Sequence, residues 1–143
     1  MKSISYLIIA LLLTSFTQKD ASELVKVLYG ESGSNYRDAW YVCQVIKNRK
    51  TEWDYKNLRD VVSSRKQFNG YKTPPKNVKD SLNCIIYHVI NDNIPDSLRI
   101  DKKTLYFCNP KIIKNKKVLN WFRKKKLVKV SHFSKNVAHY YYK

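Results

Sequence analysis

The sequence predicts an α+β fold, a single helix-rich domain that ends in a small antiparallel sheet. Apolar residues recur at helical spacing through most of residues 24–90. The segments rich in β-branched and aromatic residues all lie beyond Pro95. Helices followed by a group of strands are typical of α+β domains, and 143 residues are enough for one core. No repeat, low-complexity segment or linker divides the chain.

The N-terminus has the features of a secretory signal peptide. Lys2 supplies a short positive region, an apolar run extends from Tyr6 to Leu13, and small polar residues follow at positions 14–17. The run is too short to span a bilayer stably. We therefore expect residues 1–17 to be removed and residues 18–143 to be exported, with no stable membrane insertion after cleavage. An uncleaved anchor or a buried N-terminal helix is the alternative.

The first helix of the domain is expected to be capped by Asp20 or Ser22 and to end at Gly30. Its apolar residues at helical spacing are Leu24, Val25, Val27 and Leu28. Glu31 therefore falls at the C-terminus of this helix or in the turn just after it.

Three further helices are expected in the first two thirds of the chain. A second helix begins at Ser34 or Asn35 and carries Ala39, Val42, Cys43 and Ile46. A short third helix covers residues 57–64, and a loop without periodicity follows it. The clearest amphipathic helix opens at Pro75, in the position that proline favours at a helix start. Its apolar residues are Val78, Leu82, Ile85, Ile86, Val89 and Ile90.

The last third of the chain is expected to form the sheet. Residues 104–107, 127–130 and 138–142 are rich in β-branched or aromatic residues and predict three strands. A helical segment around Val118 and Phe122 separates the first two strands.

Positive charge is concentrated in the same C-terminal third. The net charge of the chain is +17, and from Arg99 onward fourteen Lys or Arg residues face the single acid Asp101. Such a surface favours an anionic partner: nucleic acid, anionic lipid or an anionic bacterial wall. The signal peptide argues against nucleic acid. The most basic run is Arg123, Lys124, Lys125 and Lys126. A solvated charged face is the alternative reading of this run.

The three cysteines predict neither a disulfide framework nor a metal site. Cys43 and Cys84 are expected on apolar helix faces, and Cys108 precedes an Asn-Pro turn. An odd count allows one bridge at most, and buried thiols are favoured. The spacing of the cysteines and of the three histidines supports no zinc or redox chemistry, so we expect no metal and no cofactor.

Glu31 is the most informative residue because it is a lone acid among apolar and small residues. It lies in the sequence Tyr29-Gly30-Glu31-Ser32-Gly33, at the end of the first expected helix. Desolvation and the negative end of the helix dipole both favour a protonated carboxyl there. A protonated carboxyl is what a general acid needs. The alternative is a solvated turn that merely ends the helix.

Four separated segments together resemble the SleB-type family of cell wall hydrolases, the spore-cortex-lytic enzymes. They are residues 24–31, residues 42–49, the pair Gln67-Phe68, and residues 105–110 with residues 139–142. The resemblance covers nearly all of residues 18–143. It implies a compact domain related to lysozyme and lytic transglycosylases, which cuts peptidoglycan glycan strands between N-acetylmuramic acid and N-acetylglucosamine. The signal peptide predicts a periplasmic or extracellular location, and the charge of the basic run predicts binding to the anionic wall.

The resemblance places Glu31 at the position of the family's catalytic glutamate, but this chain departs from the family's pattern at Asn35, where a second glutamate is usual. An ordinary glycoside hydrolase needs two carboxyls. A lytic transglycosylase needs one, because the C6 hydroxyl of muramic acid replaces water and the same residue first gives and then takes a proton. One-carboxylate chemistry therefore fits better. The other acids considered as partners are Asp38, Glu52, Asp54 and Asp60.

Several polar and aromatic residues are expected to bind the sugar. The expected substrate-binding residues are Tyr29, Gln67, Phe68, Tyr71, Tyr106, His139 and Tyr141. Amides and hydroxyls hydrogen-bond sugar groups, and aromatic rings stack on sugar faces. His139 matches the family's histidine near the C-terminus. The alternatives are that Phe68 is a core anchor, that the tyrosines pack the sheet, and that His139 is a structural group.

Two other functions remain open at this point. One is a wall-binding module that kept the fold and lost the chemistry, which the substitution at Asn35 favours. The other is a cationic binder of nucleic acid or of a membrane surface, which would use residues 99–143.

Overall fold

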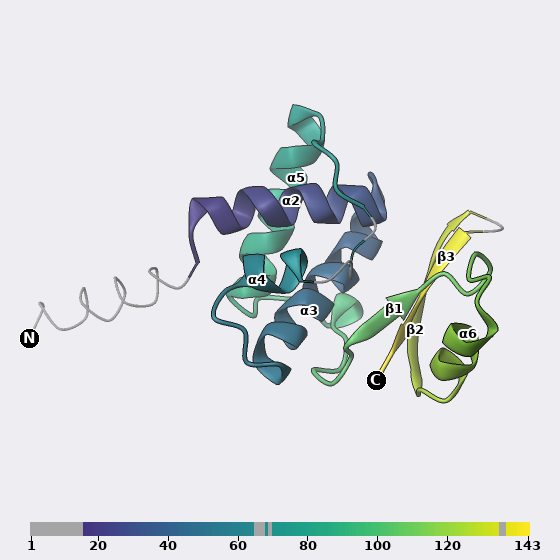
Figure 1. The fold of residues 1–143 in the computed structure, drawn as a ribbon. Coiled ribbons are helices and arrows are strands. Elements are labelled where there is room, and N and C mark those ends of the chain that lie inside the picture. Colours follow the sequence, from purple (N-terminus) through teal and green to yellow (C-terminus); the bar gives the residue numbers. More distant parts are fainter. Residues whose placement is uncertain (1–15, 65–67, 69, 135–136) are drawn as a thin grey trace, which may run out of the picture.

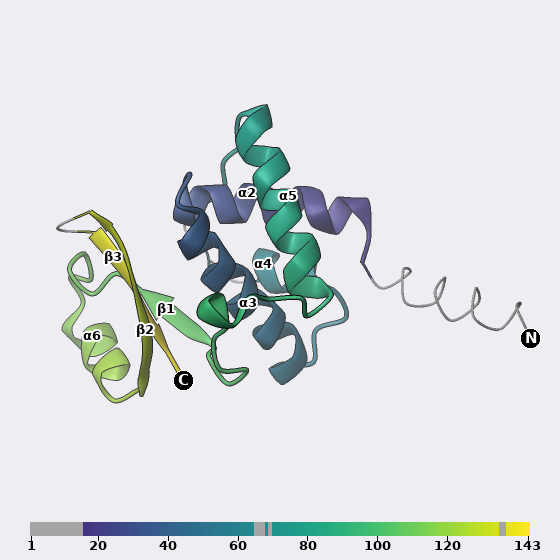
Figure 2. The same cartoon turned by 180° about the vertical axis from the view of Figure 1, so that it is seen from behind.

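The computed structural model describes residues 16–64, 68, 70–134 and 137–143. A group of helices lies beside a three-stranded sheet, and one further helix covers the opposite side of the sheet (Figure 1 and, from behind, Figure 2). The helices are α2 (Gln18–Ser32), α3 (Tyr36–Glu52), α4 (Leu58–Ser63), α5 (Lys76–Ile90), the 3-10 helix η1 (Asp96–Leu98) and α6 (Lys116–Arg123), and the strands are β1 (Tyr106–Cys108), β2 (Leu127–Ser134) and β3 (Val137–Tyr142). This order confirms the predicted α+β class.

The helix α2 begins earlier and ends later than the sequence predicted. Thr17 caps it: the Thr17 hydroxyl accepts from the N–H of Asp20 at 3.2 Å, and the Asp20 carboxylate accepts from the N–H of Thr17 at 2.9 Å. This capping box satisfies two N–H groups at once, which neither predicted cap achieves. Gly30 does not end the helix, because Gly33, with a φ of 57°, does so instead. Glu31 therefore lies within the last turn of α2.

The starts of the other helices agree with the sequence. Asn35 caps α3, and its side-chain oxygen accepts from the N–H of Asp38 at 3.1 Å. Asn57 caps α4, and Pro75 precedes the first residue of α5, as expected. Within the described residues, no helix is both long and apolar enough to cross a membrane.

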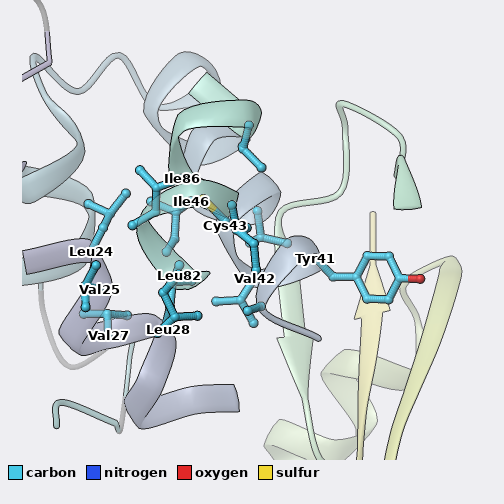
Figure 3. Close-up of a cluster of buried hydrophobic side chains, with 14 of the residues drawn as sticks. Leu24, Val25, Val27, Leu28, Tyr41, Val42, Cys43, Ile46, Leu82 and Ile86 are labelled. Carbon is cyan, nitrogen blue, oxygen red and sulfur yellow. The ribbon is translucent and has the colours of Figure 1, made fainter. Parts of the chain in front are cut away.

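The core lies between α2, α3 and α5. Figure 3 shows Leu28 of α2, Val42 and Ile46 of α3, and Leu82 and Ile86 of α5 meeting in this core, and all five are at most 1% exposed. Burial of each such side chain contributes about 1.5–3 kcal/mol to folding. These helices therefore hold the ends of α2 and α3 in fixed positions.

The sheet is antiparallel, and its strand order β1-β3-β2 places the last strand in the middle. Alternation along the strands sends Phe107 and Tyr141 to the face that packs on α3, where the Tyr141 ring lies 5.5 Å from that of Tyr41. Tyr106 and Tyr142 point to the other face and contact α6. The sheet is thus packed between α3 and α6.

The cysteines are free thiols, and one of them lies where the sequence did not place it. Cys43 is buried, and burial raises the pKa of its thiol to about 12. Cys84 is exposed, so its predicted place on the apolar face of α5 is wrong. The buried face of α5 is formed by Val78, Leu82, Ile85, Ile86 and Val89.

Candidate active site

Glu31 presents a half-buried carboxyl at the C-terminal end of α2. Its Oε1 accepts a hydrogen bond from the backbone N–H of Gly70 at 2.9 Å. Gly70 belongs to the connection between α4 and α5, so a segment distant in sequence fixes one oxygen of the carboxyl.

Two glycines make this contact possible. A Cβ atom on Gly30 would lie 2.2 Å from the carbonyl carbon of Gly70, and one on Gly70 would lie 2.1 Å from the carbonyl carbon of Gly30. The two backbones are therefore in direct contact, and the N–H of Lys72 donates to the carbonyl of Lys26 at 3.0 Å further along. A glycine inside a helix costs about 1 kcal/mol relative to alanine, and the close approach explains why it is present.

We expect Gly30→Ala to destabilise the protein, although alanine is the better helix former. The added methyl group collides with backbone, and such overpacking costs about 1–3 kcal/mol, which offsets the gain of about 1 kcal/mol in helix propensity. The bond from Gly70 to Glu31 should be lost as well. Urea unfolding measures the change, and a variant more stable than the wild type would contradict the contact.

A second carboxyl, Asp38, lies in the first turn of α3 and is fully buried. Its Oδ1 accepts from the hydroxyl of Tyr141 at 2.5 Å. Its Oδ2 accepts from the hydroxyl of Ser32 at 2.6 Å and from Nδ1 of His139 at 3.0 Å, which makes Nδ1 the protonated nitrogen of that ring. Asp38 therefore links α2 and α3 to β3, and its contact on α2 is Ser32, the residue that follows Glu31.

Tyr141 is the member of this network whose pKa is also affected by Glu31. Burial raises the pKa of its hydroxyl well above 10, and the nearby carboxylates of Asp38 and Glu31 raise it further. The hydroxyl therefore stays protonated and donates to Asp38 at all physiological pH values.

Arg49 supplies positive charge near Glu31. Its guanidinium Nε donates to the carbonyl of Leu105 at 2.6 Å, and its side chain lies over the rings of Phe68 and Trp53, at 5.1 and 5.2 Å from their centroids. Burial lowers the pKa of Arg49 to about 10, and the charges of Tyr106, Tyr55 and Glu31 oppose that change. The group stays charged at neutral pH and places a positive charge near Glu31.

Aromatic rings form a wall next to these groups. Phe107 of β1 lies 5.1 Å from the ring of His139, 5.5 Å from that of Tyr141 and 6.1 Å from that of Phe68. Phe68 is also partly buried against the core, as predicted by the alternative interpretation of this residue as a core anchor. Phe107 was part of a motif in the sequence but was not singled out as a site residue.

The remaining predicted site residues lie in different places. Tyr29 is half-buried against the core. Tyr71 is 56% exposed, and its hydroxyl donates to Glu23 at 2.5 Å, about 12 Å along α2 from Glu31. With Glu23 and Arg59, Tyr71 lines a surface pocket of about 400 Å³.

Tyr106 faces the α6 side of the sheet and contacts Trp53 and Trp121. Gln67 lies outside the described residues. The structure thus brings Phe68, His139 and Tyr141 close to one another near Glu31. The ring of Tyr106 instead contacts Trp121 of α6, and the hydroxyl of Tyr71 contacts Glu23.

The other acids do not join the site. Glu52 is exposed at the end of α3, Asp54 follows it in a turn, and Asp60 lies in the first turn of α4. Of the four partner acids considered, Asp38 is the one hydrogen-bonded to Ser32, next to Glu31. In the part of the chain that the structure describes, no group of three or more His, Cys, Asp or Glu residues is placed to hold a metal ion.

These elements build the fold of a SleB-type lytic transglycosylase catalytic domain. A solved structure, the catalytic domain of the germination-specific lytic transglycosylase SleB from Bacillus anthracis, is similar to this chain with a TM-score of 0.63 and 24% sequence identity. The similarity covers 90% of this chain and 97% of that domain. No protein-family model matches the chain, and a search of curated proteins gives no match. The likeness confirms the SleB-type fold that the sequence motifs predicted.

Proposed function

We propose that this protein is an exported lytic transglycosylase that cleaves peptidoglycan glycan strands between N-acetylmuramic acid and N-acetylglucosamine. One observation carries the proposal: Glu31 is a half-buried carboxyl held by Gly70, whereas the second carboxyl behind it, Asp38, is fully buried and hydrogen-bonded. The similar solved domain is, by its description, a lytic transglycosylase.

Glu31 acts in both steps of the proposed reaction. The protonated carboxyl first gives its proton to the glycosidic oxygen, and the bond from that oxygen to C1 of muramic acid breaks with its electron pair going to the oxygen. The Glu31 carboxylate then takes the proton of the C6 hydroxyl of muramic acid, and the oxygen of that hydroxyl bonds to C1. The products are a 1,6-anhydro end and a free sugar hydroxyl, and Glu31 is protonated again.

Asp38 is unsuited to the role of a second catalytic carboxylate. A nucleophile must reach C1 of the sugar, and a general base must hold a water molecule on the far face of the ring. Asp38 has no exposed surface, and its two oxygens already accept from Ser32, His139 and Tyr141. Its role is to position the end of α2, which supports chemistry with one carboxylate.

Asn35 fits the same interpretation. Its side chain caps α3 through the N–H of Asp38, and its amide nitrogen donates to the carbonyl of His132 at 3.4 Å. The position where the family usually has a second glutamate therefore carries a structural side chain here. Because Asn35 replaces the family's usual second glutamate, a wall-binding module without activity is the second candidate function.

Analysis of reaction products tests the proposal. Purified peptidoglycan sacculi are incubated with the protein, and the released fragments are examined by mass spectrometry. Fragments with anhydro ends are expected. Reducing ends alone would overturn the transglycosylase mechanism, and binding without any release would select the wall-binding module.

The structure bears on where the proposed signal peptide ends. Residues 1–15 lie outside the described residues, whereas Phe16 packs on the core and Thr17 caps α2. Loss of such a cap costs about 1 kcal/mol. We therefore expect the exported chain to keep Phe16 and Thr17, two residues more than the predicted boundary allowed. N-terminal sequencing of the exported protein measures this, and a first residue at Gln18 would contradict it.

Wall binding is expected to depend on the basic run after Trp121. Lys125 lies 4.4 Å from the centroid of the Trp121 ring, so it also packs α6, whereas Arg123, Lys124 and Lys126 are exposed. Replacing these three residues by Gln should weaken binding to sacculi, and salt should weaken binding by the wild type.

A matched control removes the same charge from another surface. The exposed residues Lys72, Lys76 and Lys79 lie at and before the start of α5. Their replacement by Gln should have a smaller effect on sacculus binding. Equal losses from both variants would mean that only total charge matters and that the basic run is a solvated face.

A further inference from the structure

The segment of residues 111–127, called the basic segment below, consists of α6, the connections that flank it and Leu127, the first residue of β2. It contains eight Lys or Arg residues and no acid. Within α6 no residue is buried, although the helix packs on the sheet through Trp121 and Phe122. The basic segment is therefore a strongly cationic surface on the outer side of the sheet.

Large apolar side chains are exposed within the same segment. Ile112 is 72% exposed, Leu127 47%, Trp121 43% and Val118 42%. Val118 and Trp121 are three residues apart on α6, so they share one face of the helix. The Trp121 ring packs perpendicular to the ring of Tyr106, with 4.9 Å between the centroids. Trp121 thus combines a fixed position with an exposed surface.

Charge and apolar surface together identify the kind of partner. Lysines alone would attract any polyanion, but a hydrated wall polymer or nucleic acid backbone offers nothing to an exposed isoleucine or valine. An anionic bilayer offers both, because its phosphates attract lysines and its headgroup region accepts apolar and tryptophan side chains.

We propose that the basic segment docks on the surface of a bilayer that contains anionic phospholipid. Ile112, Val118 and Trp121 enter the headgroup region, and the surrounding lysines contact lipid phosphates. The contact is peripheral, because α6 has only eight residues and is about 12 Å long.

The arrangement of the fold leaves the candidate active site free during such docking. The sheet separates α6 from α3, and the Asp38 network lies on the α3 side (Figures 1 and 2). A protein bound to a membrane through α6 would therefore present Glu31 away from the lipid. This inference does not depend on the chemistry of Glu31.

Quenching of tryptophan fluorescence by brominated lipids tests the proposal on the full chain. The quenching is local, so binding through the apolar N-terminus would not reproduce it at Trp121. Wild type and Trp121→Phe are compared, since phenylalanine keeps a ring against Tyr106 and the difference isolates Trp121. Vesicles of phosphatidylcholine with phosphatidylglycerol are compared with vesicles of phosphatidylcholine alone. Quenching specific to Trp121 is expected only with the anionic vesicles.

A second variant, Ile112→Asn with Val118→Asn, removes exposed apolar surface without changing charge. Its affinity for the anionic vesicles, followed through Trp121 quenching, should fall by about tenfold or more, while its binding to sacculi stays unchanged. Absence of Trp121 quenching would overturn the proposal. Unchanged vesicle affinity of the double variant would also overturn it, because charge alone would then explain the binding. An equal loss of sacculus binding would overturn it too, because the apolar side chains would then be assigned to wall binding.

Discussion

Glu31→Gln should abolish release of fragments from purified sacculi while leaving the fold and wall binding intact. The amide keeps the shape of the side chain, and its oxygen still accepts from Gly70. It cannot donate a proton to the glycosidic oxygen or take one from the C6 hydroxyl. Loss of general acid–base catalysis is expected to lower the rate by roughly 10² or more. The rate of fragment release measures the loss.

Glu23→Gln is the matched control for this experiment. Glu23 lies on the same helix, about two turns before Glu31, where its carboxylate accepts from Tyr71. The same chemical change there should leave the rate within a few-fold of the wild type. Wild-type rates for Glu31→Gln would contradict the proposed function. A folded Glu31→Gln protein that still binds sacculi separates lost chemistry from lost binding.

Asp38→Ala should lower the free energy of unfolding by about 3 kcal/mol or more. It leaves the buried hydroxyls of Ser32 and Tyr141 and the half-buried ring of His139 without their acceptor. Each buried donor that loses its partner costs about 1–3 kcal/mol. For a domain of this size, the midpoint of thermal unfolding should fall by roughly 10 °C. Calorimetry or circular dichroism measures the shift.

Two further variants test whether the loss of stability comes from the hydrogen-bond network of Asp38. Asp80→Ala removes an exposed acid of α5 and should change stability little. Asp38→Asn keeps one acceptor oxygen, so it should destabilise less than alanine. Equal stability of Asp38→Ala and wild type would contradict the network. A stable Asp38→Asn protein that cannot cleave sacculi would show that Asp38 takes part in the chemistry, against the one-carboxylate mechanism.

Local patterns in the sequence were sufficient for the fold. Apolar periodicity located the main helices, Asn35 and Pro75 marked two helix starts, and aromatic runs located the strands. The predicted cap and end of α2 were wrong, because Thr17 forms a reciprocal pair with Asp20 and the helix passes through Gly30. The later end of α2 selects one of the two predicted positions of Glu31, the C-terminus of the helix rather than the turn after it.

The surroundings of Glu31 depend on contacts that no local pattern encodes. Asp38 meets His139 and Tyr141 across 101 and 103 residues of sequence. These pairings require the register of β3 and its packing on α3, and the sequence alone left the face of Asp38 open. The contact between Gly30 and Gly70 is also tertiary. A glycine in a helical pattern was its one visible signal.

The position of β3 between β1 and β2 determines when the site can form. Among the described residues, β1 and β2 each pair with β3 and not with each other, so neither has a partner strand until β3 has been synthesised. The same strand brings His139 and Tyr141 to Asp38. The helices α2 to α5 can pack early through nearby contacts, whereas contacts over a hundred residues form slowly. A chain that is synthesised from its N-terminus is therefore without its completed site until β3 has been made.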